Sequence, residues 1–314
     1  MVIRSYSQFK KFGECPHRWS LERKYEPRRK ALALDEGTAF HLVLGKLYGA
    51  KNFAVGLDVL ATYFGELKPR DAEDAERLRD KMNALASVTS AYWTRVALRD
   101  LDEFEIEHIE KPFSFDLGDG VRVVGYIDGV WRHRGTGVRF LVEHKYQGDL
   151  EDELMPLDLQ VSLYTLALLP EYGLLPTLYN VCRKPALRQK KKETKDEFLV
   201  RVRLEVDEGS KDLSYSGVTG FDSRYLVRRL YSRGMADLDA ALQQIRTQSR
   251  FMEAIERDPS LTWRNVGDHC LYWCPFRDIC IFEDPIVVEE FFIVKRPFDG
   301  KALRLPGPAP EVRI

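Results

Sequence analysis

The stretch that decides the fold is Val123–Tyr146, which reads VVGYIDGVWRHRGTGVRFLVEHKY. It holds two apolar runs with strand-like character, and the turn signal at residues 135–137 separates them. A similar run at residues 104–117 comes before them and ends at the Gly-Asp-Gly sequence of residues 118–120. We therefore predict an antiparallel meander of three strands.

The flanking sequence changes to a helical period on both sides of this meander. Further strands are expected at residues 177–183 and 198–206. Helices are predicted at residues 9–25 (with a bend or restart at Gly13 and Pro16), 37–47, 71–98, 156–169 and 221–256. A cysteine-bearing loop is expected at residues 269–280, followed from Pro297 by a proline-rich arm. This order of elements predicts an α/β fold with a central sheet flanked by helices.

Composition places the chain among globular proteins of one large domain or two modest ones. Its 314 residues are 44% hydrophobic and 31% charged. The longest apolar stretch, Leu163–Pro176, is broken by Pro170 and Glu171 and is too short to span a bilayer. The first residues lack the apolar centre of a signal peptide. We therefore expect a cytoplasmic location and no membrane partner.

Two acidic residues and a lysine in the deciding stretch suggest metal chemistry. Side chains alternate along a strand, so Glu143 and Lys145 share one face while His144 faces the other. Asp128 ends the apolar part of the preceding strand, where an antiparallel pairing brings it near Glu143. Such carboxylates can hold Mg²⁺ or Mn²⁺, and the lysine can position water or stabilise charge. A surface ion pair is the alternative, but acids in such apolar strands usually have a function.

Three polar residues on helices have two interpretations each. His41 lies in the apolar sequence GTAFHLVLGKL, where a histidine is more often a satisfied core residue than a ligand. Gln160 and Tyr164 are four residues apart in LQVSLYTL and therefore share a helix face. Such a pair is ordinarily a packing feature, although it follows directly after the Glu-x-Lys strand.

Four of the five cysteines have a pattern typical of metal ligation. Cys270, Cys274 and Cys280 form C-x3-C-x5-C, and Cys15 is a distant fourth. Disulfides are improbable in a cytoplasmic chain, so clustered thiols indicate a metal centre. The spacing suits either a 4Fe–4S cluster or a structural zinc, for which His269 is a further candidate ligand. Cys182 has the pattern of an ordinary buried cysteine.

A basic run stands out in a chain whose net charge is only −1. Seven of the thirteen residues from 183 to 195 are lysine or arginine. A solvated loop is the simpler interpretation. A contact with the phosphate backbone of a nucleic acid is the alternative, and it involves Arg183, Lys184, Lys190, Lys191 and Lys192.

Taken together, these residues resemble the iron–sulfur RecB-like PD-(D/E)XK nucleases, which include AddB-type helicase–nucleases and CRISPR-associated and phage RecB-like exonucleases. The opening SYSQFKKFGECPHRW is similar to that family's serine and Cys-Pro motif. GTAFH resembles its G-x-x-x-H motif, GYIDGV its aspartate motif, EHK its (D/E)-x-K motif and QVSLY its Q-x-x-x-Y motif. With the closing cysteines, the matches follow the family's order over residues 5–280.

The resemblance implies a role for each of these residues. His41, Asp128 and Glu143 would be metal ligands and Lys145 the catalytic lysine. Gln160 and Tyr164 would support the site or contact DNA. The 4Fe–4S cluster would be held by Cys15, Cys270, Cys274 and Cys280.

The resemblance also implies a fold and a domain organisation. The fold would be a restriction-endonuclease-like core, a central mixed sheet flanked by helices, with a helical insertion. A cysteine-ligated cluster would join the N- and C-terminal segments. The expected parts are cluster segments 1–30 and 257–285, a nuclease core 31–256 with the insertion at about 50–100, and a C-terminal strand and tail 286–314.

The activity implied is that of a metal-dependent DNA nuclease, specifically an exonuclease in recombination, repair or phage DNA processing. Its substrate would be DNA that is single-stranded or has free ends. The sequence shows no G-x-x-x-x-G-K-[ST] motif, so the protein is expected to be a stand-alone nuclease or to supply only the nuclease part of an assembly. In an assembly, a helicase or recombination protein is the expected partner. Two alternatives are a catalytically silent nucleic-acid-binding scaffold and a nuclease stabilised by zinc instead of iron.

Overall fold

The structure is a computed structural model that describes residues 1–27, 36–69, 71–148, 152–216, 220–272, 274–282 and 285–295. The chain divides into two compact units. The smaller unit combines residues 1–33, 112–125 and 235–314, and the larger unit combines residues 34–111 and 126–234. The predicted proline-rich arm lies outside the described residues.

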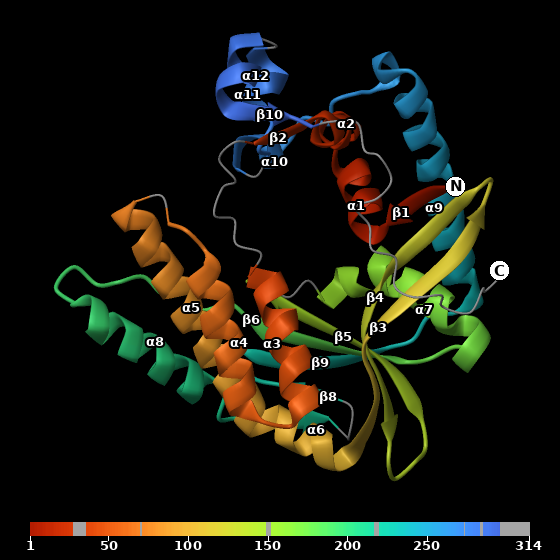
Figure 1. Ribbon diagram of the computed structural model, residues 1–314. Coiled ribbons are helices and arrows are strands. Elements are labelled where there is room, and N and C mark those ends of the chain that lie inside the picture. The colour runs from red at the N-terminus through yellow and green to blue at the C-terminus, as the bar shows by residue number, and fades with distance from the viewer. Residues whose placement is uncertain are drawn as a thin grey trace. The chain divides into compact units, whose positions relative to one another are not determined.

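A mixed β-sheet forms the centre of the larger unit (Figure 1). Neighbouring strands follow the order β4, β5, β6, β9, β8 and β7, and β3 also pairs with β4. The β5–β6 pair is parallel and the other pairs in this order are antiparallel. The bounds are Phe104–Gly118 for β3, Val121–His133 for β4, Arg139–Gln147 for β5, Thr177–Arg183 for β6, Ser214–Ser216 for β7, Gly220–Asp222 for β8 and Leu226–Tyr231 for β9. The predicted strands of the meander are confirmed.

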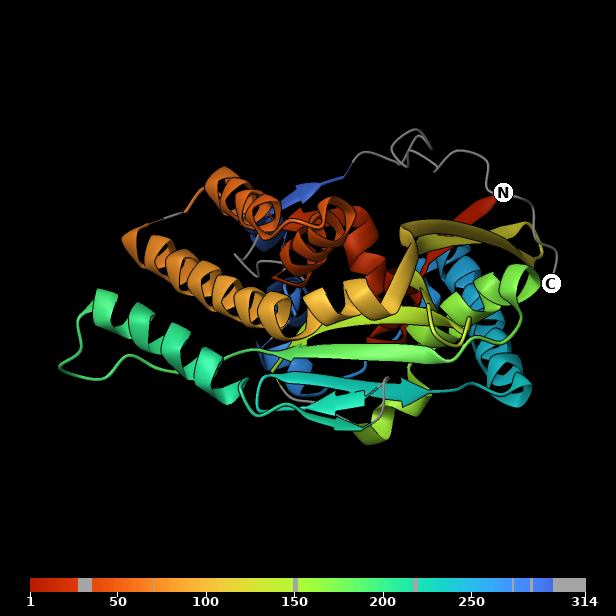
Figure 2. The same cartoon turned by 90° about the horizontal axis from the view of Figure 1, so that it is seen from below.

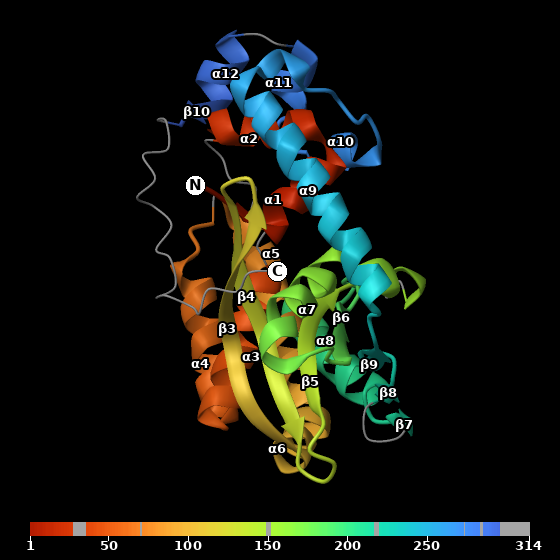
Figure 3. The ribbon, with the colours of Figure 1, turned by 90° about the vertical axis from the view of Figure 1, so that its right-hand side faces the viewer.

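Helices cover both faces of this sheet. Figure 2 shows α3, α4 and α5 together on one side of the strands, and Figure 3 shows α7 on the other. The helices of this unit are α3 (Glu36–Ala50), α4 (Phe53–Glu66), α5 (Ala72–Tyr92), a π-helical turn (Trp93–Ala97), α6 (Leu98–Glu103), a 3-10 turn (Asp152–Leu157), α7 (Leu159–Tyr172) and α8 (Lys195–Gly209). Among the described residues, no helix is both long and apolar enough to cross a membrane. The predicted fold class, a central mixed sheet flanked by helices, is confirmed.

The strand predicted at residues 198–206 is wrong, because this segment is the helix α8. Its apolar residues alternate in sequence, which suggested a strand. The structure buries Phe198, Val202 and Val206, which are four residues apart, and exposes Leu204. The capping box of Thr194 and Glu197 supplies a start signal for the helix. A helical period and an N-cap therefore override the apparent alternation.

The helix predicted at residues 221–256 is also wrong over its first part. Residues 220–231 form the strands β8 and β9, and the helix α9 (Met235–Arg257) begins after Gly234. The sequence Leu226–Tyr231 pairs with the whole of the central strand β6 except its last residue, Arg183. Pairing with a buried strand is a long-range interaction that the local sequence does not reveal. The predicted helix was therefore started too early, although the helical periodicity belongs to α9 alone.

The smaller unit contains the first strand, two short helices and the C-terminal elements. β1 (Val2–Ser5) pairs in parallel with residues 121–124 of β4. The restart predicted near Pro16 is confirmed, since α1 (Tyr6–Glu14) ends before Cys15 and α2 (Pro16–Lys24) begins after it. The remaining elements are β2 (Tyr25–Pro27), α9, a 3-10 turn (Pro259–Leu261), α10 (Asp268–Tyr272), α11 (Arg277–Phe282), α12 (Pro285–Phe291) and β10 (Phe292–Val294).

Segments from both ends of the described chain pack together within this smaller unit. β10 pairs with β2, and Phe276, Ile279 and Phe292 form a buried cluster with Leu21 of α2. The predicted loop at residues 269–280 is in fact the two short helices α10 and α11 joined by a turn. Burial of Phe276 and Ile279 against Leu21 explains why this cysteine-bearing segment is folded rather than irregular.

Candidate metal centre

The strands β4 and β5 separate where the acidic residues of the deciding stretch lie. Their ladder runs as far as Gly129 and Val142. Beyond that pair, the backbone N–H of His144 donates to Asp128 Oδ2 at 2.8 Å. The carboxylate thus takes the place of a carbonyl acceptor, so the N–H of His144 stays satisfied where pairing ends. We call this point, between Gly129–Val142 and Asp128–His144, the strand fork.

Three side chains of metal-ligand type converge at the strand fork. One donor atom from each of His41, Glu110 and Asp128 lies within 4.8 Å of the other two. His41 Nδ1 is 3.2 Å from Asp128 Oδ1, the oxygen that does not accept from His144. Helix α3, strand β3 and strand β4 each supply one member of this group.

Glu110 was not predicted from the sequence. It has a φ of +47°, a left-handed conformation that non-glycine residues rarely adopt and that occurs often at functional sites. Strand β3 passes close to α3 here, since a Cβ added at Gly45 would stand 3.7 Å from Glu110 Cγ. Gly45 is one turn beyond His41, so both face β3. In the sequence, Glu110 is an acidic residue before Lys-Pro within a predicted strand. This pattern is too common to identify a metal ligand.

The structure brings together a second group, which consists of four predicted site residues. Lys145 Nζ forms an ion pair with Glu143, a residue with 0% exposure, and donates to Gln160 Oε1 at 2.5 Å. Gln160 Nε2 in turn donates to the hydroxyl of Tyr164 at 2.7 Å. Strand β5 and helix α7 therefore present a connected row of polar groups on one face of the sheet.

Asp158, which was not predicted, anchors this row. It is the N-cap of α7, where its Oδ1 accepts from the N–H of Gln160 at 2.8 Å. Its Oδ2 accepts from the hydroxyl of Tyr179 on β6 at 2.9 Å. Asp158 thus fixes the start of α7 against the sheet and orients the residue that contacts Lys145.

Burial and mutual charge shift the pKa values of the site strongly. Burial and the charge of Asp128 raise the pKa of Glu143 to about 8, although Lys145 opposes this shift. Burial disfavours the charged form of His41, but the hydrogen bond and charge of Asp128 outweigh it and raise the pKa of His41 to about 9. Burial also acts against protonated Lys145, yet the charge of Glu143 raises its pKa. The pKa of Glu110 is raised by burial and by Asp128.

These groups fit a divalent cation. Neither carboxylate oxygen of Glu143 has a hydrogen-bond partner among the described residues, so its contact is the ion pair with Lys145. Buried carboxylate oxygens without such partners are costly unless a cation compensates them. His41, Glu110 and Asp128 bring one imidazole and two carboxylates together, and Glu143 adds a third carboxylate whose pKa responds to the charge of Asp128. Such donors suit Mg²⁺ or Mn²⁺. Together with burial, the excess of negative charge keeps the pKa values of Glu143 and Glu110 above their ordinary range.

Comparison with known proteins identifies the family. Residues 4–281 match the PD-(D/E)XK nuclease superfamily. The chain belongs to this superfamily. Its members use divalent metals and act on nucleic acid, so membership supports a metal-dependent nuclease. A search of curated proteins found no significant match.

The four cysteines of the predicted cluster lie in the smaller unit. Cys15 is buried between α1 and α2, and its Sγ accepts from the N–H of Arg18 at 3.4 Å. Burial raises the pKa of the Cys274 thiol, and the nearby sulfurs of Cys270 and Cys15 add to this effect. All five cysteines are unbridged by disulfides. Cys182 lies apart from the four on β6 of the larger unit, as a buried residue.

Hydrogen bonds join the two segments that carry these cysteines. The N–H of His17 donates to the Trp263 carbonyl at 3.0 Å, and Asn265 Nδ2 donates to the Glu14 carbonyl at 3.1 Å. The second bond reaches the residue before Cys15. Residues 14–17 and 263–265 are therefore adjacent in space although about 250 residues separate them in the chain.

The residues of the predicted basic contact fall into two sets. Lys184 forms an ion pair with Glu36, and Arg183 donates to the carbonyls of Ser223 and Arg224 at 3.2 and 3.1 Å. These two side chains are engaged in contacts within the larger unit. The second set is fully on the surface and consists of Lys190, Lys191 and Lys192.

Glu110 provides the first test of this geometry. We expect Glu110→Gln to weaken Mn²⁺ binding by about tenfold, because it removes one carboxylate charge from the cation site. Isothermal titration calorimetry with Mn²⁺ measures the effect. Glu105→Gln is the matched control, since Glu105 lies on the same strand but pairs with Arg132. Equal affinities for wild type and Glu110→Gln would exclude Glu110 from the ligand set.

Proposed function

We propose that this protein is a metal-dependent DNA nuclease that acts as an exonuclease on DNA with free ends or single-stranded DNA. The observation that carries the proposal is the group of His41, Glu110 and Asp128 at the strand fork, with the Glu143–Lys145 ion pair near enough for the charge of Asp128 to act on both its members. Buried acids beside one lysine are suited to binding a cation and a phosphodiester together. DNA as the substrate, the exonuclease mode and a role in recombination, repair or phage DNA processing rest on the resemblance described above.

In this proposal His41, Glu110, Asp128 and Glu143 hold Mg²⁺ or Mn²⁺. The bound cation would polarise the phosphate and lower the pKa of an attacking water. His144 keeps Asp128 in place through its backbone N–H, which leaves Asp128 Oδ1 directed toward His41. The four proposed ligands come from four elements of the larger unit, namely α3, β3, β4 and β5. A bound cation would hold these elements together.

Lys145 supplies positive charge at the scissile phosphate in this mechanism. Its pKa is raised by Glu143 against the effect of burial, so the ammonium group keeps its proton near neutral pH. A protonated lysine stabilises negative charge that develops on the phosphate and orients water through its N–H donors. Gln160 and Tyr164 hold Lys145 at the correct angle through the two hydrogen bonds described above. We assign both to positioning.

A 4Fe–4S cluster held by Cys15, Cys270, Cys274 and Cys280 is the second part of the proposal. Two hydrogen bonds that join residues 14–17 to residues 263–265 support this proposal, as does the effect of the Cys270 and Cys15 sulfurs on the pKa of Cys274. A structural zinc held by the same four cysteines is the alternative. The cluster is structural, because hydrolysis transfers no electrons.

The expected partners follow from the same proposal. The family that the sequence resembles includes nucleases that work together with helicases. We therefore propose a helicase or recombination protein as a partner. The three surface lysines Lys190, Lys191 and Lys192 are proposed to contact the phosphate backbone, with Arg183 and Lys184 in supporting roles.

Cleavage assays with the site variants test the main proposal. We expect Asp128→Asn, Glu143→Gln and Lys145→Met each to lower the cleavage rate by more than about a hundredfold while the protein stays folded. End-labelled linear DNA and covalently closed circular DNA, incubated with Mg²⁺, Mn²⁺ or EDTA, provide the measurement. Asp222→Asn, which affects a surface ion pair with Arg229, is the control. Metal-independent binding of DNA without cleavage by the wild type would instead indicate a silent scaffold.

The salt dependence of DNA binding tests the surface lysines. Replacing Lys190, Lys191 and Lys192 together with alanine should reduce the slope of log affinity against log salt by about 2 to 3, because fewer counterions are released. Fluorescence anisotropy with Asp128→Asn protein in Ca²⁺ measures binding without cleavage. The control is a triple variant with the same charge change at the exposed residues Lys46, Lys51 and Lys68. If the slope were identical to that of the parent protein, these lysines would not contact DNA and the run would be a solvated loop.

Colour and elemental content test the cluster. Protein purified without oxygen should be brown, absorb broadly near about 400 nm and contain about four irons per chain. Alanine at Cys15, Cys270, Cys274 or Cys280 should bleach the protein and destabilise it, because metal binding contributes to folding. Cys182→Ala is the control and should keep its colour. About one zinc and no iron would refute the iron–sulfur assignment, and colour retained in Cys15→Ala would refute the ligand set.

A further inference from the structure

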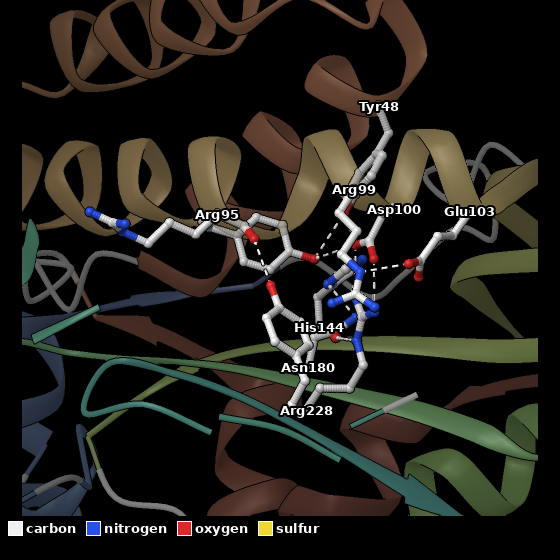
Figure 4. Close-up of polar contacts among 10 residues, drawn as sticks. Tyr48, Arg95, Arg99, Asp100, Glu103, His144, Asn180 and Arg228 are labelled. Atoms are coloured by element: carbon white, nitrogen blue, oxygen red, sulfur yellow. Dashed lines mark hydrogen bonds and ion pairs between the residues drawn. The ribbon is translucent and has the colours of Figure 1, made fainter. Parts of the chain in front are cut away.

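A buried polar network joins strands of the sheet to the helices α3 and α6 (Figure 4). It includes His144, which lies on the face of the sheet opposite Lys145 because side chains alternate along β5. Arg228 of β9 and Asp100 of α6, each 2% exposed, form a bidentate ion pair with N–O distances of 2.8 and 2.7 Å. Arg228 Nε also donates to Asn180 Oδ1 on β6. The Asn180 amide in turn lies 3.3 Å from His144 Nδ1 on β5. The network thus ends at the residue between Glu143 and Lys145.

The same network extends in the other direction to helix α3. The hydroxyl of Tyr48 donates to Asp100 Oδ2 at 2.8 Å and lies 2.9 Å from the hydroxyl of Tyr92. The ring of Tyr48 stacks on the imidazole of His144, with centroids 6.0 Å apart and an interplanar angle of 26°. Tyr92 meets the same imidazole edge-on. The chain of contacts from His144 through Asn180, Arg228, Asp100 and Tyr48 therefore closes on His144 again.

Two members of this ring belong to the elements that carry the metal ligands. Tyr48 lies two helical turns after His41, so both project from one side of α3. His144 is flanked by Glu143 and Lys145, and its own N–H holds Asp128. The separation of α3 from β5 thus sets the distance between the imidazole of His41 and the carboxylates of the strand fork.

Stability alone is a poor explanation for such a network. Burying two charged groups costs free energy that their mutual attraction often fails to recover, and apolar residues of similar size would fill the same space. A fully satisfied polar network does, however, fix one arrangement of the elements it joins. The buried imidazole of His144 is neutral at pH 7, since burial lowers its pKa to about 4. It therefore accepts from Asn180 and adds no third charge.

We propose that Tyr48, Asp100, Asn180, Arg228 and His144 form a positioning network that sets α3 against β5 and so pre-organises the cation site. The proposal rests on the metal site described under the proposed function. None of the five side chains contacts the cation or the substrate in this assignment. They act through the helix that carries His41 and through the strand that carries Glu143.

The variant Tyr48→Phe tests this role with the smallest change. It removes one hydroxyl from the network and keeps the ring that stacks on His144. We expect the Kd for Mn²⁺, measured by calorimetry on folded protein, to rise by about tenfold, the lower end of the effect of groups that orient metal ligands. The cleavage rate should fall at low Mn²⁺ and return to the wild-type value at saturating Mn²⁺. A purely structural role would lower the melting temperature and leave the Kd unchanged.

A second pair of variants separates positioning from general stability. Arg228→Met breaks the buried pair of the network, whereas Arg4→Met breaks the ion pair between the buried Arg4 and the partly exposed Glu256 in the smaller unit. We expect weaker Mn²⁺ binding for Arg228→Met and unchanged binding for Arg4→Met. If wild type binds no Mn²⁺, the metal site itself fails. If wild type binds Mn²⁺ and both Tyr48→Phe and folded Arg228→Met match its Kd, the positioning network is refuted while the metal site stands.

Discussion

The hydrogen bond from the His144 N–H to Asp128 Oδ2 is the contact on which the candidate centre depends. Two antiparallel strands that stayed paired would present their side chains to neighbouring helices and leave no common space for a ligand. Separation of β4 from β5 opens that space, but it would orphan a backbone N–H in a buried region. The Asp128 carboxylate accepts that N–H with one oxygen and meets His41 with the other.

The charged side chains on the two faces of the sheet are balanced in different ways. Strand β5 alternates Glu143, His144 and Lys145, so one face carries a buried acid with its lysine and the other carries a neutral imidazole. Behind that imidazole the Asp100–Arg228 pair is fully internal. Glu143 and Asp100 thus each have an opposite charge beside them, whereas acids outnumber cations around His41, Glu110 and Asp128. An added cation would offset that local excess of negative charge.

In the smaller unit, the stability of short helices depends on contacts between segments that are distant in the sequence. Its N-terminal helices are only nine residues long, and the C-terminal helices α10 and α11 are shorter still. Helices of this length are not stable alone, so they depend on tertiary contacts. The β2–β10 pair and the cluster around Phe276 provide such contacts. Thiolates bound to one metal cluster would add a further link between the same segments.

Local sequence determined the meander, the shared face of Glu143 and Lys145 and the helical restart at Pro16, because strand alternation and proline geometry act over a few residues. Motif order also indicated the superfamily. Burial against distant elements selected between competing periods in two segments: residues 198–206 became a helix, which the Thr194 capping box also starts, and residues 226–231 became a central strand. The tertiary structure alone brought Glu110 to His41 and Arg228 to Asp100. No local pattern encodes these pairs, because which distant charges meet depends on strand register and on how closely a helix packs against the sheet.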